Sequence, residues 1–113
     1  MAKKSNIEVA PSSGNVFADL GFAEPEEELT RAQLASRIQQ IVKRRRLTQM
    51  AAGKLMGIDQ PKVSALLNGR LANFSSTRLM RLLTALGQDV EIVIKTKPKS
   101  RERGRVRVIE AQP

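Results

Sequence analysis

The segment from Leu47 to Gly69 constrains the fold more than any other part of the chain. Thr48 precedes an apolar periodic stretch and is a favourable N-cap, because its hydroxyl can accept hydrogen bonds from the first turn of a helix. Gly57 can supply the positive φ that ends a helix within one residue. Asp59 is a second N-cap, and the helix that follows it begins at Gln60. The two N-caps and the glycine between them predict two short helices joined by a tight turn.

Apolar spacing assigns each of these helices an inward face. The residues expected to face the core are Ala52, Leu55, Met56, Ile58, Val63, Leu66 and Leu67. Small side chains at residues 51–53 allow the second helix to cross the first closely. The residues left on the rim or facing outward are Gln60, Pro61, Lys62, Ser64 and Ala65. A second helix with a polar face opposite an apolar one is typical of a DNA-reading helix-turn-helix.

Two further helices are predicted on either side of this pair. The first begins at Thr30, because Thr30 and Gln33 have the spacing of a capping box, and it continues to Arg46. The last runs from about Ser76 to Leu86, and Gly87 ends it. Their predicted core positions are Leu34, Ile38, Ile41, Val42, Leu79, Leu82, Leu83 and Leu86. Residues 30–87 are therefore expected to form one mainly α domain with four helices.

Residues 1–29 have little periodicity and are expected to be a flexible, largely disordered arm. Two of the chain's three Phe residues lie in its short, Gly-interrupted middle. Its apolar side chains are Val16, Phe17, Leu20 and Phe22, which are typical of anchors that become ordered on a protein partner. The alternative is that they fold back onto the helices of the same chain.

After Gly87 the apolar period changes from 3.6 to 2, which predicts a β-strand in the C-terminal part, residues 88–113. Val90, Ile92 and Ile94 form one face of this strand, and residues 105–109 alternate again more weakly. A lone strand has unpaired edges, so it requires the second strand, a twin from another subunit, or a partner protein. We favour pairing between subunits, because a helix-turn-helix homodimer can reach two half-sites about 34 Å apart.

The chain has 113 residues and a net charge of +9, distributed unevenly. Residues 1–29 have a net charge of −4, residues 30–70 of +8 and residues 71–113 of +5. The basic middle and tail fit a polyanion, whereas the acidic arm requires a different partner. Two basic runs have an alternative interpretation as cations that are only exposed to solvent and bind no DNA. These runs are the helix end at residues 43–46 and the tail at residues 95–107.

The residue types that the chain contains argue against several other classes of protein. The chain has no Cys, His, Tyr or Trp, and its acids at residues 24–28 have no supporting groups, so no catalytic site or metal site is expected. No cofactor is implied. No apolar run is long enough for a membrane span, and no apolar signal core follows Met1, so we expect a protein of the reducing cytoplasm. RNA binding is disfavoured because 3% aromatic residues offer no stacking platform.

The helix-turn-helix segment resembles the XRE family, whose fold is that of the lambda-type repressors. The residues that carry the resemblance are Leu-Thr-Gln at residues 47–49, the Gly-Ile turn, Gln60, Val-Ser at residues 63–64 and the closing Asn-Gly. The resemblance implies a nucleoid-associated protein that binds a double-stranded DNA operator. It places Gln49 and Asn68 at phosphate-contacting positions. Neighbouring phosphate candidates are Lys43, Arg44, Arg45, Arg46, Thr48 and Arg70, and the base-edge candidates are Gln60, Pro61, Lys62, Ser64 and Ala65.

Two departures from the family pattern limit the expected readout. Pro61 and Ala65 stand where polar base readers are common, so direct hydrogen bonding to bases falls mainly to Gln60 and Lys62. The remaining discrimination would come from methyl contacts and DNA shape.

The arm, the helix-turn-helix and the terminal strand together resemble HigA-type antitoxins over residues 12–95. This resemblance implies a RelE-like or HigB-like ribonuclease toxin as partner, and autorepression of the operon that encodes the pair. The alternative is a stand-alone repressor of the prophage type with no toxin partner.

Overall fold

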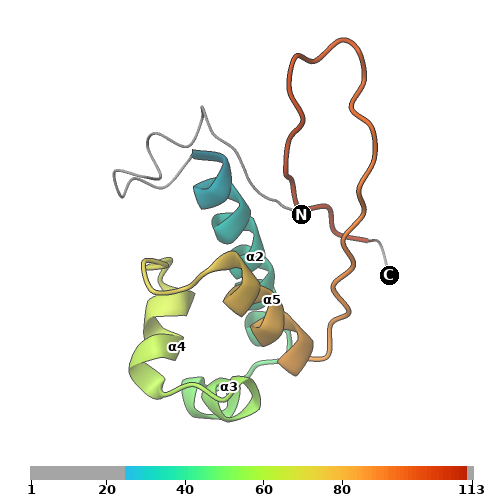
Figure 1. Ribbon diagram of the computed structural model, residues 1–113. Helices are drawn as coiled ribbons and strands as arrows, with labels where there is room; N and C mark the ends of the chain where they lie inside the picture. Colours follow the sequence, from blue (N-terminus) through green and yellow to red (C-terminus); the bar gives the residue numbers. More distant parts are fainter. Residues whose placement is uncertain (1–24, 112–113) are drawn as a thin grey trace, which may run out of the picture.

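The computed structural model describes residues 25–111, and Figure 1 shows that the helices in this range form a bundle. Helix α2 comprises Pro25–Arg44, α3 Gln49–Met56, α4 Gln60–Leu67 and α5 Ser76–Ala85. The prediction of four helices with a helix-turn-helix at their centre is confirmed over this range. The expected anchors Val16, Phe17, Leu20 and Phe22 lie outside the described residues.

Helix α2 begins five residues before the predicted start at Thr30. Pro25 fits the first turn because its missing N–H would have no partner there, and the acidic run 26–28 is favoured by the positive end of the helix dipole. Thr30 is buried inside the helix, where its Oγ1 donates a hydrogen bond to the carbonyl oxygen of Glu26 at 3.0 Å. The predicted capping box at Thr30 and Gln33 is therefore wrong.

The predicted caps of α3 and α4 are confirmed. Thr48 Oγ1 accepts a hydrogen bond from the Ala51 N–H at 3.0 Å, and Asp59 Oδ1 accepts one from the Lys62 N–H at 3.1 Å. Gly57 has a φ of 72°, in the left-handed region, and it turns the chain between the two helices. The helix-turn-helix is thus built by interactions between residues a few positions apart.

The core lies where α2 meets α5 and α4, with α3 closing the bundle against α4 and α5. Its buried apolar residues are Leu34, Ala35, Ile38, Ile41, Val42, Ala52, Met56, Val63, Leu66, Phe74, Leu79, Leu82, Leu83 and Leu86. Three predicted core positions differ: Leu55 is 44% exposed, and Ile58 and Leu67 are half-buried at the edge of the core. Leu55 is exposed because only one side of the short helix α3 contacts its neighbours.

No β-strand is present in residues 88–111, so the predicted strand at Val90, Ile92 and Ile94 and its weaker counterpart at residues 105–109 are wrong for the single chain. The segment instead leaves α5, runs outward and returns beside α2 (Figure 1). Ile92 and Ile94 are 74% and 92% exposed. Of this apolar face only Val90 packs against the core, and within residues 25–111 no ladder of hydrogen bonds joins the two limbs of the segment.

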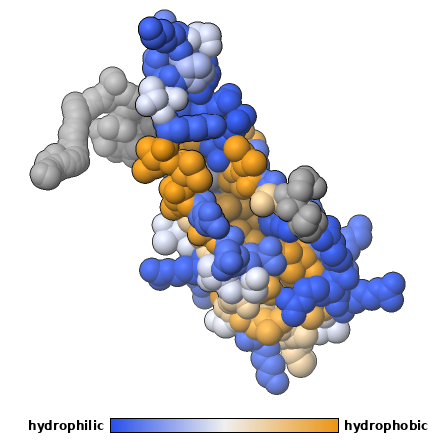
Figure 2. Space-filling model, turned by 90° about the vertical axis from the view of Figure 1, so that its right-hand side faces the viewer, coloured by the Kyte–Doolittle hydropathy of each residue, from blue (hydrophilic) through white to orange (hydrophobic). Residues whose placement is uncertain are grey.

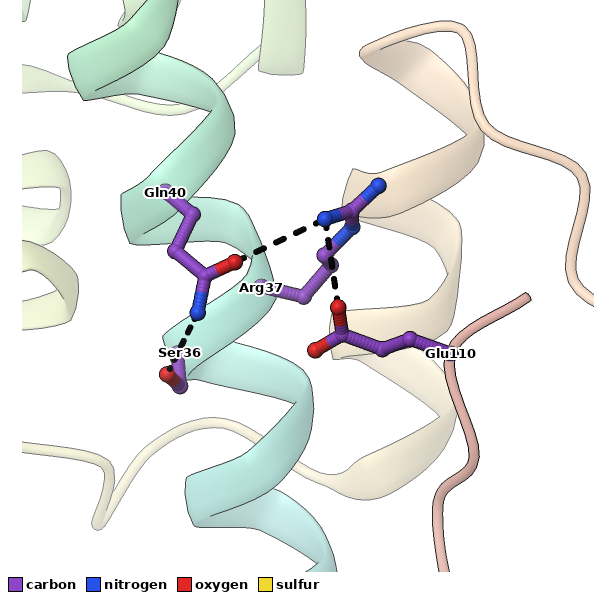
Figure 3. A network of polar contacts seen from close by, with 4 residues as sticks. All are labelled: Ser36, Arg37, Gln40 and Glu110. Atoms are coloured by element: carbon purple, nitrogen blue, oxygen red, sulfur yellow. Dashed lines mark hydrogen bonds and ion pairs between the residues drawn. The ribbon is translucent and has the colours of Figure 1, made fainter. Parts of the chain in front are cut away.

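Polar contacts to α2 hold the returning limb. Arg37 of α2 forms an ion pair with Glu110 at 3.2 Å and lies beside Gln40, which hydrogen-bonds to Ser36 (Figure 3). Gln33 Oε1 accepts a hydrogen bond from the Val108 N–H at 3.4 Å.

Of the helices that the structure describes, none has the length and hydrophobicity that a bilayer span requires.

Candidate nucleic-acid interface

Helix α4 has one face in the core and the other in solvent. Val63 and Leu66 are fully buried, whereas Gln60, Pro61 and Lys62 at the beginning of the helix are exposed. The first turn of α4 therefore presents an amide and an ammonium group outward, next to backbone that Asp59 caps. Such a helix can approach a groove of duplex DNA with its polar end first.

Two contacts fix the position of α4, and the sequence predicted only the second of them. Gln39 of α2 donates a hydrogen bond from Nε2 to the carbonyl oxygen of Leu66 at 3.0 Å. Gly53 of α3 faces the start of α4, where a Cβ would lie 2.7 Å from the Ile58 carbonyl oxygen and 3.1 Å from Val63 Cγ2. The close approach predicted from the small residues of α3 is present. Gln39 gives no signal in the sequence, because its partner is a backbone carbonyl 27 positions away.

The side chains at the starts of α3 and α4 come together. Gln60 Nε2 donates to Gln49 Oε1 at 3.4 Å, so the candidate base reader and the candidate phosphate contact are adjacent. A shallow hollow beside them is lined by Gln49, Met50, Gly53, Lys54, Ile58 and Gln60. Met50 is 76% exposed, and Lys54 adds an exposed cation to the same side. Lys54 was absent from the predicted site although it lies one turn after Met50 on the helix that carries Gln49.

The end of α4 is less open than the sequence suggested. Ser64 and Ala65 are half-buried, and the Ala65 side chain packs against the core. The side-chain amide of Asn68 donates to the Ser64 carbonyl oxygen at 2.8 Å, so this amide stabilises the end of the helix. Arg70 is exposed just beyond it. Among the outward-facing candidates of α4, the exposed set is Gln60, Pro61 and Lys62.

The basic run at residues 43–46 ends α2 and is exposed throughout. Arg45 donates a hydrogen bond from a terminal guanidinium nitrogen to the Leu86 carbonyl oxygen at 3.2 Å, and so it ties the end of α2 to the end of α5. Arg46 adopts a left-handed φ of 55° where the chain turns toward Thr48. Arg45 thus has a structural role in addition to its exposed charge.

In residues 25–111, no three acidic side chains are grouped as a metal site requires.

Comparison with known proteins places this geometry in a family. The profile of a helix-turn-helix domain family matches residues 16–95. A solved structure whose name assigns it provisionally to the XRE family of transcriptional regulators is 52% identical and superposes with a TM-score of 0.74, over 76% of this chain and 97% of the other. The chain belongs to the XRE family. No curated protein matches the chain significantly.

Membership of the XRE family makes the chain a DNA-binding helix-turn-helix protein of the transcription-regulator class. In such a protein α3 and α4 are the two helices of the motif, and α4 is the helix that enters the groove. The exposed beginning of α4 and the cations around it are therefore the candidate DNA contacts of this XRE-family chain.

Proposed function

We propose that this XRE-family protein is a sequence-specific repressor that lays the beginning of α4 in the major groove of an operator. The observation that carries the proposal is the exposure of Gln60 and Lys62 on a helix whose other face is fully buried. A Lys can donate to guanine O6 and N7, and a Gln can pair with adenine N6 and N7. Ser64 and Ala65 are farther along the helix and half-buried, so only their remaining exposed atoms would add contacts at the edge of the site.

Phosphate contacts would fix the register of the helix on the duplex. The proposed phosphate residues are Thr48, Gln49, Asn68, Arg70, Lys43, Arg44, Arg45 and Arg46. Lys54 extends this set, because it is exposed on the same side as Gln49. Counterion release from these cations would make operator affinity fall steeply with salt.

We propose that two chains bind one operator as a homodimer. Val90, Ile92 and Ile94 alternate along a limb whose backbone, from residue 90 to 95, forms no hydrogen bond within the described part of the chain, and the last two side chains are largely exposed. Figure 2 shows apolar side chains gathered on the face that bears this segment. Pairing with a second copy would cover them and satisfy the free backbone groups.

Replacement of Lys62 by Ala tests the reading role of α4. The expected result is a loss of operator affinity of about 1–3 kcal/mol, the range for one good base contact, with unrelated duplexes affected much less. Quantitative gel shifts with a fragment of the protein's own promoter measure the effect. Arg81→Ala, on the exposed side of α5, is the matched control. Equal affinities for wild type and Lys62→Ala would remove Lys62 from the reading surface.

We further propose that the protein is an antitoxin, whose residues Val16, Phe17, Leu20 and Phe22 bind a RelE-like or HigB-like ribonuclease toxin. Support comes from the sequence of the arm, which combines apolar anchors with a net negative charge that suits a basic enzyme. Toxin occupancy would then tune repression of the shared operon. The second candidate is a stand-alone repressor of the prophage type, which the XRE fold accommodates equally.

Deletion of residues 1–24 separates these two candidates. The truncation keeps α2 intact, because the helix begins at Pro25. We expect it to bind the operator like the full chain but to fail to protect cells that express the toxin encoded by the neighbouring gene. Phe17→Ala/Phe22→Ala is the milder variant and should weaken co-purification with the toxin. Survival of cells with the truncated protein would show that the arm is not the inhibitory element.

A further inference from the structure

A second basic element begins at the last residue that matches the helix-turn-helix family, Lys95, and continues past the matched range. Lys or Arg occupies every second position from Lys95 to Arg107, with one acid, Glu102, among them. The row is not straight, because the chain turns and bends at residues 99–103. Within each of the two limbs on either side of this turn, a period of two in an extended chain would place cations on one face about every 6.6 Å. Phosphates on one strand of B-form DNA are about 3.4 Å apart along the axis, so the cations of a limb can meet every second phosphate.

This basic loop, defined as residues 95–105, is held at both ends. On the outgoing side, Val90 is half-buried and packs against the core. On the returning side, the Val106 N–H donates to Glu26 Oε2 at 2.6 Å, and Arg37 pairs with Glu110 at 3.2 Å (Figure 3). A turn with an Arg101 N–H to Pro98 carbonyl hydrogen bond of 3.2 Å closes the tip. The loop is thus partly ordered before it binds, which lowers the entropy cost of binding.

The cations of this row are crowded and uncompensated. Six of the seven are exposed, and Arg101 is half-buried. Within residues 25–111 none of them forms an ion pair. The neighbouring charges of Arg101 and Arg107 lower the pKa of Arg105. A polyanion would relieve this repulsion. Apart from Pro98, no apolar side chain lies between Lys95 and Arg105, so the loop lacks the large apolar anchors on which protein interfaces depend.

The place of the loop decides which polyanion it can reach. Figure 1 shows the loop on the far side of α2 and α5 from α3 and α4. No hydrogen bond or ion pair in the described part of the chain links it to either of those helices. A straight duplex in contact with the beginning of α4 therefore lies away from the loop. We propose that the basic loop binds the phosphate backbone of a second duplex DNA segment, so that one protein particle bridges two duplexes.

The proposal rests on the proposed binding of a first duplex by α4, and a two-duplex capture assay separates the two. Promoter DNA is immobilised on beads, the protein is added, and retention of a labelled duplex of unrelated sequence is measured. The charge-loss variant is Lys97→Gln/Lys99→Gln/Arg103→Gln, and the matched control is Lys97→Arg/Lys99→Arg/Arg103→Lys, which keeps every charge. The charge-loss variant should bind the beads normally but retain the second duplex about tenfold less or worse, because it loses three phosphate contacts. Normal binding to the beads also shows that it is folded.

Several outcomes would overturn bridging by the loop. Undiminished capture by the charge-loss variant would mean that two copies of α4 hold the two duplexes. Loss of capture by the charge-keeping control would mean that side-chain shape rather than charge matters. Tighter binding of the loop to anionic phosphatidylserine vesicles or to single-stranded RNA than to duplex would assign it another partner. The variant Gln60→Ala/Lys62→Ala tests the loop apart from α4. If this variant still binds duplex DNA, and the binding weakens with salt and with the charge-loss substitutions in the loop, the result supports the proposal even if wild type shows no operator preference. Absence of such binding contradicts the proposal.

Discussion

At the scale of single residues, Gly53 couples the two helices of the motif. Its missing side chain lets the backbone of Ile58 and a methyl group of Val63 approach α3. The fully buried Ala52 beside it allows the same closeness. The orientation of the beginning of α4, and hence of Gln60 and Lys62, depends on this contact because α4 follows Ile58 after a single residue, Asp59.

Gly53→Ala should lower the free energy of unfolding by about 1–2 kcal/mol. Overpacking costs about 1–3 kcal/mol, and the better helix propensity of Ala recovers about 0.5–1 kcal/mol of it. The Ile58 carbonyl is backbone and cannot rotate away from the added Cβ. Urea denaturation followed by circular dichroism measures the change. Gly104→Ala is the matched control, since no atom lies within 4 Å of its Cβ position, and a similar stability for both variants would contradict this account.

At the scale of elements, α4 is short and depends on its neighbours. Leu66 is fully buried, and Gln39 of α2 binds the Leu66 carbonyl oxygen, whereas Leu67 lies at the edge of the core. An isolated helix of this length is not stable in water, so packing rather than propensity maintains it. The DNA-facing surface is therefore only as stable as the apolar contacts behind it.

Leu66→Ala should destabilise the domain by about 2–5 kcal/mol, because it leaves a cavity beneath α4. Leu67→Ala should cost clearly less, since its side chain is already partly in water. Thermal unfolding of the two variants and wild type gives the comparison. If the two losses are equal, α4 is not held chiefly through Leu66.

At the scale of the whole molecule, the described chain has a compact helical body and an open C-terminal segment. The body buries its apolar residues, but the segment exposes Ile92, Val93 and Ile94 by 74%, 78% and 92%. Exposed apolar residues next to unpaired backbone are the features of a strand that pairs with another chain. The basic loop, residues 95–105, follows the apolar residues 92–94 without including them. Pairing of two subunits through the apolar residues is therefore compatible with the proposed second DNA contact.

Ile92→Lys/Ile94→Lys should convert the proposed dimer into monomers, because both positions lie on one face of a period-two segment and would place charges in the pairing surface. Sedimentation velocity at several protein concentrations measures the shift, and operator affinity should fall with it. Val93→Lys points to the other face and should leave the dimer largely intact. Dimers of unchanged stability in the double variant would place the subunit contact elsewhere.

Particular residues show which parts of the site the sequence specifies. The caps at Thr48 and Asp59 and the turn at Gly57 were predictable, because each acts on backbone atoms within three or four positions. Exposure of Gln60 and Lys62 followed from the period of the apolar residues. The roles of Gln39 and Arg45 were not predictable, since their partners Leu66 and Leu86 lie 27 and 41 positions away.

The sequence by itself determined the two short helices, their turn and the polar face of α4, because these depend on residue spacing and on hydrogen bonds within one or two turns. Tertiary structure alone decided that Leu55 faces water, that Ala65 packs inward and that residues 90–94 form no strand in a single chain. Each of these depends on which surfaces meet. Burial and strand pairing require a second surface, and residue order does not specify where that surface lies.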